Sequence, residues 1–416
     1  MKRYKITTLG CRTNQYESQA LLDQLKKEGY LEAQKGEKAD LCIVNTCTVT
    51  ESADKRSLYQ IRKLSREYSP ERMVVTGCLA ERMGKELQEL PHVTDVIPNH
   101  HKESLLPRVF PDTEWPEFSI KRFEAHTRAF VKIQDGCNSY CSYCIIPFVR
   151  GRSRSKKMGE ILKEVSALVQ NGYKEVVLTG INIGDFGPES LGTLVREIDQ
   201  VEGLERIRIS SIDPDEVDED LISAVVEGKK TCPSMHIVLQ SGSNLTLKRM
   251  RRKYTKQDFL DSVSRLISAH PLFTFTTDLI VGFPGETEEE FQESVDLVKK
   301  IQFAKVHVFP YSDRPKTRAS RMPHKISKEV IAKRKAQLIE VAEQSAFELR
   351  KQWVGEEFLV LLESEEKGDY MMGHTSNFLT VYVPKEGMRP NKIIKVKMVQ
   401  NNPEGYLGEN QVVSKV

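Results

Sequence analysis

The chain contains 416 residues, which corresponds to roughly two to four domains of ordinary size. Hydrophobic residues make up 39% and charged residues 29%, which is typical of globular proteins and excludes disorder, collagen and a small disulfide scaffold as descriptions of the whole chain. The 62 basic and 59 acidic residues give a net charge of +3, so any nucleic-acid-binding surface must be local.

No apolar run approaches the roughly 20 residues that a membrane helix requires. The first residues are basic but lack the apolar stretch of a signal peptide. We therefore expect a cytoplasmic, monomeric protein without a membrane-spanning segment. In such a chain the eight cysteines are expected to be ligands or core residues and not disulfides.

Short apolar runs alternate with helical patterns in residues 1–110, which we assign to an N-terminal domain. The predicted strands are Tyr4–Leu9, Leu41–Val44, Met73–Thr76 and Asp95–Ile97. The predicted helices are Asn14–Glu28, Ser52–Tyr68 and Arg82–Leu90. This alternation indicates an α/β domain with a parallel sheet. Prolines punctuate residues 98–125, which predicts a linker.

The alternation resumes in residues 126–353 with a longer period. The predicted strands are Ala129–Gln134, Glu175–Leu178, Arg206–Ser210, His236–Leu239, Thr274–Val281 and Lys305–Phe309. The predicted helices are Gly159–Asn171, Ser190–Val201, Asp218–Glu227, Lys256–Ala269, Glu288–Ile301 and the long, basic Ser327–Trp353. Six strands are two fewer than a closed (β/α)₈ barrel has, so we predict a partial, open (β/α)₆ barrel.

Short strands separated by Gly, Pro and Asn follow in residues 354–416. They are Phe358–Leu362, Met371–Thr375, Leu379–Val383 and Ile393–Val399. This pattern predicts a third, C-terminal domain that is a small antiparallel β-barrel.

Cys137, Cys141 and Cys144 follow the first strand of the central domain with the spacing C-x₃-C-x₂-C. Three thiolates on one loop can bind three irons of a cubane cluster and leave the fourth iron open to a substrate. A structural zinc site is the competing interpretation, but zinc normally takes four ligands arranged in two pairs. The spacing and the position at a strand end favour the cluster.

Cys11, Cys47 and Cys78 each lie just past the carboxyl end of a predicted N-terminal strand. Because parallel strands end at one edge of a sheet, we expect these thiols to converge and to bind a second cluster with one open iron. Gly10 and Gly77 suit a backbone that approaches a bulky group closely. The competing interpretation is that small buried cysteines favour strand ends, which accounts for one cysteine better than for three.

The motif C-x₃-C-x-aromatic-C, with Tyr143 as the aromatic residue, resembles the signature of the radical S-adenosylmethionine (SAM) enzymes. Together with the three N-terminal cysteines, the chain resembles the radical SAM methylthiotransferase family over its whole length. The segments Thr8–Ser18 and Asn45–Thr50 are most similar to the threonylcarbamoyladenosine tRNA subgroup. The C-terminal segment is similar to the RNA-binding TRAM domain.

The resemblance implies two [4Fe-4S] clusters. One, on Cys137, Cys141 and Cys144, binds and cleaves SAM. The other, on Cys11, Cys47 and Cys78, carries the sulfur that is inserted. SAM then serves as both radical source and methyl donor, and the radical removes an aromatic hydrogen that no ordinary base can take. An electron donor such as flavodoxin and a sulfur donor are also implied.

Strand ends of the central domain are expected to hold SAM. The candidate contacts are Tyr143, Gly180, Asn182, Ser211, Gln240 and Gly282. Simpler interpretations remain open: Gly180 suits a tight turn, and the segment after Gly282 suits a helix start capped by Thr287.

Basic runs without many acids predict a polyanionic substrate. They are Arg150, Arg152, Arg154, Lys156 and Lys157; Lys248, Arg249, Arg251, Arg252, Lys253 and Lys256, beside Tyr254 as a base-stacking candidate; Arg314, Lys316 and Arg318; and Lys385, Arg389, Lys392, Lys395 and Lys397. The balancing acids are expected on other surface segments, Asp213–Asp220 and Glu286–Glu290. A tRNA anticodon stem-loop fits, because its unstacked adenosine next to the anticodon can enter a pocket.

Three alternatives remain open from the sequence. The substrate could be isopentenyladenosine in tRNA, or an aspartate of a ribosomal protein, although the basic C-terminal domain disfavours the second. The third alternative is a non-catalytic RNA-binding protein with structural clusters or zinc. It predicts no SAM cleavage.

Overall fold

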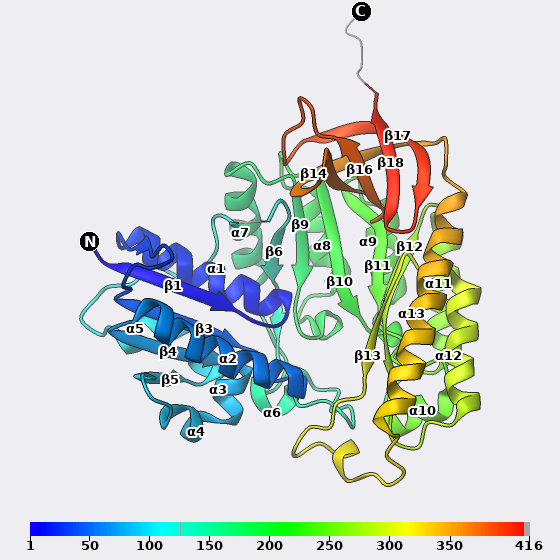
Figure 1. Cartoon of the computed structure of the whole chain (residues 1–416). Coiled ribbons are helices and arrows are strands. Elements are labelled where there is room, and N and C mark those ends of the chain that lie inside the picture. The colour runs from blue at the N-terminus through cyan, green and yellow to red at the C-terminus, as the bar shows by residue number, and fades with distance from the viewer. Residues whose placement is uncertain (125, 412–416) are drawn as a thin grey trace, which may run out of the picture.

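The computed structural model describes residues 1–124 and 126–411, and it contains three successive units (Figure 1). They are a five-stranded sheet, a six-stranded sheet and a closed five-stranded barrel. Residue 125 of the predicted linker and residues 412–416 of the predicted C-terminal domain lie outside the described residues. Within the described ranges, no helix combines the length and apolar character that crossing a lipid bilayer requires.

The N-terminal sheet is entirely parallel, as predicted, with the order β2-β1-β3-β4-β5. Its strands are β1 (Arg3–Thr8), β2 (Leu31–Glu32), β3 (Leu41–Thr46), β4 (Arg72–Gly77) and β5 (Asp95–Ile97). The helices are α1 (Arg12–Lys27), α2 (Glu51–Tyr68), α3 (Cys78–Arg82), α4 (Gly84–Gln88), η1 (Asn99–Ser104) and α5 (Leu105–Val109). The prediction of a linker from residue 98 was wrong for η1 and α5, because Leu105 and Leu106 are buried in the core of this unit beside Tyr4.

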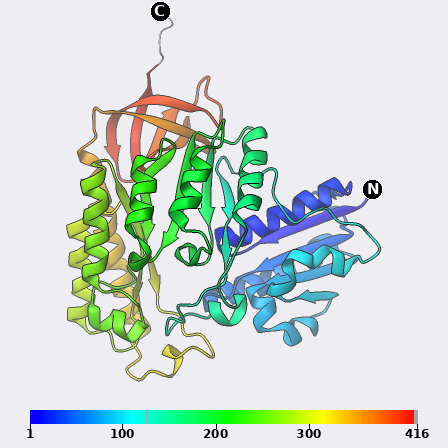
Figure 2. The ribbon, with the colours of Figure 1, turned by 180° about the vertical axis from the view of Figure 1, so that it is seen from behind.

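The central sheet is parallel and open, in the order β13-β12-β11-β10-β9-β6. The strands are β6 (Ala129–Lys132), β9 (Glu175–Thr179), β10 (Arg206–Ile212), β11 (Thr231–Ile237), β12 (Thr274–Val281) and β13 (Lys305–Pro310). The crossover helices are α7 (Met158–Gln170), α8 (Leu191–Asp199), α9 (Glu219–Glu227), α11 (Lys256–Ala269), α12 (Glu288–Ile301) and α13 (Lys328–Lys351). Short elements complete it: α6 (Ile146–Arg150), α10 (Asn244–Met250), η2 (Ile183–Asp185), η3 (Pro214–Glu216) and η4 (Ala319–Arg321). Helices cover its outer face (Figure 2) and leave the inner face toward the N-terminal unit (Figure 1).

The third unit is a closed barrel with the strand order β14-β15-β16-β18-β17. Its strands are β14 (Glu357–Lys367), β15 (Tyr370–Thr375), β16 (Thr380–Pro384), β17 (Ile393–Asn402) and β18 (Gly405–Asn410). The prediction of a purely antiparallel barrel was wrong, because β16 and β18 pair in parallel and close the ring. The sequence analysis also missed β18, whose two glycines and lack of alternation hide a strand.

The barrel is attached to the inner side of the central sheet by arginines of β10. Arg206 donates to the carbonyl oxygens of His374 (3.1 Å) and Leu359 (2.8 Å), and Arg208 donates to that of Ser376 (3.1 Å). Arg350 of α13 donates to two more backbone carbonyls of the barrel, at Asn402 and Pro403. Several hydrogen bonds from two elements therefore hold the barrel and the central sheet in one arrangement.

The N-terminal and central units are joined by a buried ionic network around Glu17 of α1. Its carboxylate accepts from Lys102 of η1 (2.5 Å) and from Arg150 of α6 (3.1 Å), and Lys132 of β6 lies 3.6 Å away. Burial alone would raise the pKa of Glu17, but the charges of Arg150, Lys102 and Lys132 hold it well below its usual range. The carboxylate is therefore ionised and fixes α1 against the central unit.

Candidate active site

Cys11, Cys47 and Cys78 lie together at the carboxyl edge of the N-terminal sheet. They follow β1, β3 and β4, which are neighbours in the sheet. Cys11 is exposed, while Cys47 and Cys78 are buried. Burial raises the pKa of Cys47 and Cys78; the nearby thiols of Cys78 and Cys11 add to the shift of Cys47, and that of Cys11 adds to the shift of Cys78. The expected convergence of these three side chains is therefore observed.

Two glycines give this edge its shape. A Cβ atom on Gly10 would lie 2.9 Å from the Cys47 Cβ and 3.1 Å from its Sγ. A Cβ on Gly77 would lie 2.4 Å from the backbone oxygen of Thr46. Both glycines also have φ near +100°, at +103° and +96°. No larger residue fits at either position without moving the cysteine-bearing loops.

Cys137, Cys141 and Cys144 lie on one loop after β6. The loop is closed by the antiparallel pair β7 (Gln134–Asp135) and β8 (Arg154–Ser155). Ser142 fixes its centre, since its N–H donates to the Met250 oxygen (2.9 Å) and its hydroxyl to the Arg249 oxygen (2.8 Å). The three thiols are therefore presented on a rigid loop.

Hydrogen-bond donors point at these sulfur atoms. Arg252 donates to the Cys141 Sγ at 3.0 Å, and the Ser139 N–H donates to the Cys137 Sγ at 3.4 Å. Burial raises the pKa of Cys144 to about 12 and that of Cys47 to about 11. Since the free thiols are neutral at physiological pH, metal binding must displace their protons, and N–H donors stabilise the resulting thiolates.

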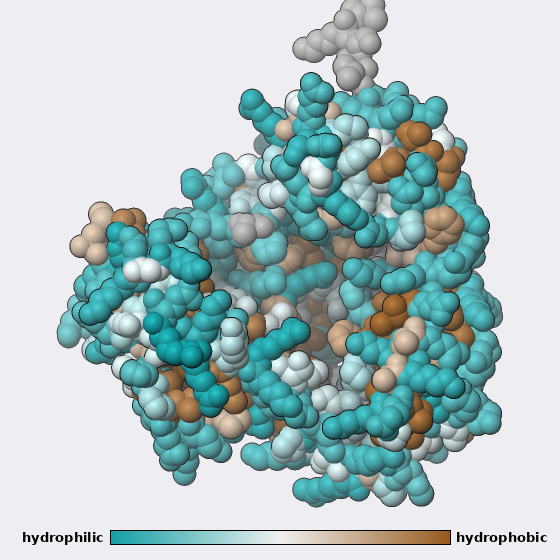
Figure 3. Space-filling model, viewed as in Figure 1, coloured by the Kyte–Doolittle hydropathy of each residue, from teal (hydrophilic) through white to brown (hydrophobic). Residues whose placement is uncertain are grey.

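The two cysteine groups are neighbours across the domain boundary. Cys78 packs in one apolar cluster with Ile145, the residue after Cys144, and with Val149 of α6. Arg150 of the same helix donates to Asn14 and Glu17 of α1. A hollow between the N-terminal unit and the strands of the central sheet is visible in Figure 3. The two cysteine groups therefore lie close together in the fold.

Tyr143 lies on the cysteine loop itself, and Gly180 and Asn182 contact Gln134 on the strand that leads into it. Gly180 approaches Gln134, whose side-chain oxygen accepts from the N–H groups of Ile181 (3.0 Å) and Asn182 (2.9 Å). The Asn182 side chain donates to Glu216 at 2.8 Å. Burial, with the nearby Asp213 charge, raises the pKa of Glu216 to about 7. Tyr143 packs edge-on against Phe283, and the buried side-chain oxygen of Gln240 lacks a partner among the described residues.

The other two predicted contacts differ in their surroundings. Ser211 is paired in register with His236 of β11, so it shares the inner face of the sheet. Gly282 has φ +74°, and a Cβ atom there would lie 2.3 Å from the Ile331 side chain of α13. Its N–H donates to Glu286, in the turn that precedes the helix cap Thr287. For Gly282 the structure provides a backbone reason for glycine, and the predicted cap at Thr287 is confirmed.

Several charges predicted as surface are internal. Arg150 and Arg314 are buried in ion pairs with Glu17 and Asp54, and Arg252 pairs with Asp213. On the acidic side, Asp213 and Glu286 are buried, contrary to expectation. Tyr254 is also buried, with its hydroxyl donating to the Val238 oxygen (2.6 Å), so the expectation that it stacks on a base was wrong.

The remaining basic residues form two groups, one exposed to solvent and one half-buried. The predicted members that are exposed are Arg152, Arg154, Lys157, Lys248, Arg251, Lys253, Lys316, Arg318, Lys385, Arg389, Lys392, Lys395 and Lys397. Lys156 and Arg249 are half-buried in pairs with Glu164 and Glu290, and half-buried Lys256 pairs with Glu293. The exposed set includes every predicted lysine and arginine of the C-terminal barrel.

Sequence reasoning missed a group on the inner face of the central sheet: His236 of β11, Asp278 of β12 and His307 of β13. It also missed Arg12, which follows Cys11 directly. The three strand residues are about 30 to 40 positions apart, so no local motif marks them. Strand register was the only available signal, since Asp278 and His307 are direct partners.

Family models match the chain in two segments. The model described as "Uncharacterized protein family UPF0004" matches residues 3–98, which carry the first cysteine group. The Radical SAM superfamily model matches residues 131–298, which carry the second. The two matches coincide with the N-terminal sheet and most of the central sheet.

Similar proteins extend over nearly the whole chain. The threonylcarbamoyladenosine tRNA methylthiotransferase MtaB of Chlamydia pneumoniae is 45% identical over 98% of this chain and 97% of its own length. A tRNA-2-methylthio-N(6)-dimethylallyladenosine synthase of Carboxydothermus hydrogenoformans is 35% identical over 96% of this chain and 97% of its own. The structure resembles the radical SAM methyltransferase TsrM of Kitasatospora setae (TM-score 0.56, 14% identity, 89% of this chain and 81% of that chain), which concerns the fold alone. The chain belongs to the radical SAM methylthiotransferase family.

Proposed function

We propose that this methylthiotransferase acts on tRNA and converts N6-threonylcarbamoyladenosine, 3′-adjacent to the anticodon, to its 2-methylthio derivative. The observation that carries the proposal is the apolar cluster that Cys78 forms with Ile145 and Val149, which brings the two cysteine groups close together. Sulfur insertion at an unactivated carbon needs a radical source and a sulfur source near the same atom. The choice of nucleoside is supported by the 45% identity to a threonylcarbamoyladenosine enzyme, against 35% to a dimethylallyladenosine enzyme.

The family uses SAM and [4Fe-4S] clusters. We assign one cluster to Cys137, Cys141 and Cys144, and the auxiliary cluster to Cys11, Cys47 and Cys78. The donor set fits, because in neither group do the three sulfur atoms all lie within 4.8 Å of one another. A single tetrahedral zinc ion would require sulfurs about 4 Å apart. When bound, the groups supply a 5′-deoxyadenosyl radical from SAM, which removes the C2 hydrogen, and the sulfur and methyl group that replace it.

The protein's own residues bind SAM and hold the cluster ligands in position. Arg252 stabilises the Cys141 thiolate by its N–H···S bond, and Asp213 holds the Arg252 guanidinium. Tyr143, Gly180, Asn182, Ser211, Gln240 and Gly282 remain our candidates for SAM contacts. Among them, Asn182 has Glu216 beside it as an acceptor for a cationic amino group. Gln240 has a free oxygen directed into buried space.

The exposed basic residues of the C-terminal barrel support a TRAM-like role in RNA binding. Lys385, Arg389, Lys392, Lys395 and Lys397 are all exposed. Phosphate contacts of this kind supply most of the affinity of such proteins for RNA. We propose that they hold the anticodon stem-loop while one unstacked base enters the hollow. An aspartate of a ribosomal protein offers no comparable polyanion for this surface.

The reaction also requires partners that we propose on chemical grounds. An external electron donor such as flavodoxin must reduce the first cluster, and a sulfur donor must replenish the auxiliary one. We place the reaction in the cytoplasm, where tRNA is available, and expect a monomer to suffice, because each chain carries both cysteine groups.

Mass spectrometry of tRNA nucleosides tests the proposal. The tRNA comes from cells that lack the endogenous activity and express this protein or its Cys47→Ala variant. We expect a methylthio mass gain on threonylcarbamoyladenosine with the intact protein and none with the variant. A gain on isopentenyladenosine would overturn the choice of nucleoside. No gain on any nucleoside would overturn the tRNA assignment.

A further inference from the structure

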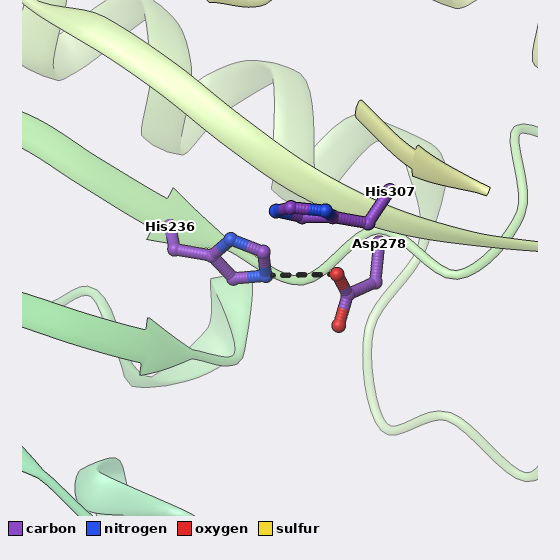
Figure 4. A group of neighbouring side chains, drawn as sticks. All are labelled: His236, Asp278 and His307. Carbon is purple, nitrogen blue, oxygen red and sulfur yellow. Dashed lines mark ion pairs between the residues drawn. The ribbon is translucent and has the colours of Figure 1, made fainter. Parts of the chain in front are cut away.

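His236, Asp278 and His307 form a compact polar cluster on three neighbouring strands, here called the inner-face cluster (Figure 4). One ligand-type atom from each of the three side chains lies within 4.8 Å of the other two. The His236 Nε2 lies 3.4 Å from an Asp278 carboxylate oxygen, while its Nδ1 lies 2.8 Å from the Thr276 hydroxyl. In Figure 4 the imidazole of His307 lies over this pair. The cluster therefore offers both N–H donors and a carboxylate acceptor.

Arg12 brings a positive charge within electrostatic reach of Asp278 and His307. Its guanidinium lies 5.5 Å from the Phe130 ring, on the inner side of β6. Across residues 1–124 and 126–411 its side chain makes no hydrogen bond or ion pair. The neighbouring Arg128 and Arg208 differ, since Glu363 and Glu175 neutralise them at 3.3 and 2.8 Å. A half-buried guanidinium without an anion is costly unless a ligand supplies one.

Electrostatic interactions connect Arg12 with the inner-face cluster. The Arg12 guanidinium lies close enough to Arg128, Arg208 and Asp278 to interact with their charges. Burial lowers the pKa of His307; Asp278 opposes this shift, and His236, Lys305 and Arg12 reinforce it. His307 is therefore neutral at physiological pH and offers one N–H. The space between these side chains carries positive potential.

This positive potential favours an anionic ligand over a divalent cation at the inner-face cluster. A divalent cation would face Arg12 and Lys305 with only one carboxylate, Asp278, to compensate it. One nitrogen of His236 is already engaged with Thr276. An anionic group instead pairs with Arg12, for which carboxylate is the best-matched planar partner. Hydroxyl or amide groups near that anion find their partners in Asp278 and the two histidines.

We propose that Arg12 and the inner-face cluster form the receptor for a carboxylate-bearing substituent on the N6 atom of the substrate adenosine. Arg12 binds the carboxylate, and the cluster binds the polar atoms around it. The inference rests on the proposed function and names the residues that set its specificity. Because Arg12 directly follows Cys11, the receptor also places the base beside the auxiliary cysteine group. A hydrocarbon substituent would desolvate Arg12 without supplying an anionic partner, and sites built for polar groups discriminate strongly against ligands that lack them.

The test pairs changes in the protein with changes in the substrate. Full-length protein with reconstituted clusters is given anticodon stem-loops that carry threonylcarbamoyladenosine or its threoninamide analogue, which lacks the negative charge. Dissociation constants and methylthiolation rates are measured for the wild type, Arg12→Gln, Arg12→Lys and His307→Asn. Lys316→Gln serves as the matched control, because it removes one exposed positive charge outside the receptor.

We expect the wild type to prefer the acid over the amide by roughly 10- to 100-fold, the range for a hydrogen-bonded charge. Arg12→Gln should reduce this ratio to about 1, Arg12→Lys should retain part of it, and His307→Asn should weaken both ligands. Lys316→Gln should weaken both equally and keep the ratio. Each ratio is measured within one variant, so partial misfolding cancels.

Two results would overturn the inference. One is an acid-to-amide ratio that is unchanged in Arg12→Gln. The other is a stoichiometric divalent ion that is lost in His307→Asn but kept in Arg12→Gln, which would make the cluster a metal site. Failure of the proposed function looks different, because then the wild type itself would not methylthiolate the acid substrate.

Discussion

Arg150 and Glu17 form a buried ion pair of 3.1 Å between the helix that follows the Cys137–Cys144 loop and the helix that follows Cys11. The Arg150 side chain is fully inaccessible to solvent, and that of Glu17 nearly so, at 0% and 2% exposure. Arg150 also donates hydrogen bonds to the side chains of Asp135 and Asn14. This pair therefore fixes the relative position of the two cysteine groups.

Glu17→Gln is expected to lower the free energy of unfolding by about 3–5 kcal/mol, because it leaves buried cations unpaired. The folded pKa of Glu17 lies below its unfolded value, so its contribution is complete above pH of about 4 and is lost in more acid solution. Denaturant titrations at several pH values should show the two proteins converging in acid. Glu37→Gln, which breaks the exposed pair with Arg3, should cost less than about 1 kcal/mol. Equal effects of both variants would contradict this role.

Gly10→Ala is expected to prevent binding of the auxiliary cluster while the other cluster is retained. The added methyl group would meet the Cβ of Cys47 at 2.9 Å. Iron and sulfide analysis should therefore give about half of the wild-type content. Gly36→Ala is the control, since Gly36 also has a positive φ of +89° but nothing within 4 Å of the added atom. Full iron content in Gly10→Ala would refute the assignment of Cys47 to a cluster.

Arg252→Gln is expected to make the potential of the SAM-binding cluster more negative, because it removes the N–H donor to Cys141. Reductive SAM cleavage should slow by roughly 10- to 100-fold, as for other residues that support metal ligands. A redox titration followed by electron paramagnetic resonance measures the shift. Arg251→Gln changes an exposed neighbour and should leave the potential unaltered. Arg252→Lys, which keeps a charge for Asp213, separates the loss of the sulfur contact from loss of the ion pair.

Glu216→Gln is expected to stabilise the protein at pH 8 by roughly 3 kcal/mol. The pKa of Glu216 is raised to about 7 in the folded state, above its ordinary value of 4.5. The folded state therefore holds a proton that the unfolded state has lost, and stability falls as pH rises from 4.5 to 7. Thermal unfolding at pH 5 and pH 8 should show the difference only at the higher pH. Equal stability of both proteins at pH 8 would mean that Glu216 titrates normally.

Much of the site could be predicted from the sequence because parallel strands end at one edge. Cys11, Cys47 and Cys78 are 36 and 31 residues apart, yet each follows a strand, and the strands proved to be neighbours. The six central strands could also be recognised, because each is a short apolar run between helical patterns. These predictions needed only the local pattern and the rule that parallel strands end at one edge of the sheet.

Side-chain contacts between residues far apart in the chain could not be predicted in this way. Arg150 and Arg252 stand in basic runs, and nothing in those runs shows that Glu17 and Asp213 lie opposite them in the fold. Tyr254 looked available for base stacking until the backbone oxygen of Val238 was found to accept its hydroxyl. Such pairings depend on tertiary packing between residues that are tens or hundreds of positions apart.

The attachment of the C-terminal barrel through Arg206, Arg208 and Arg350 has a consequence for geometry. A stem-loop bound on the barrel is held at a fixed distance from Cys11 and Arg12. The position of the modified base is then selected by its distance from the bound stem as well as by its chemical identity. Adding a nucleotide to the anticodon loop would then shift the modification to whichever residue lies at that distance.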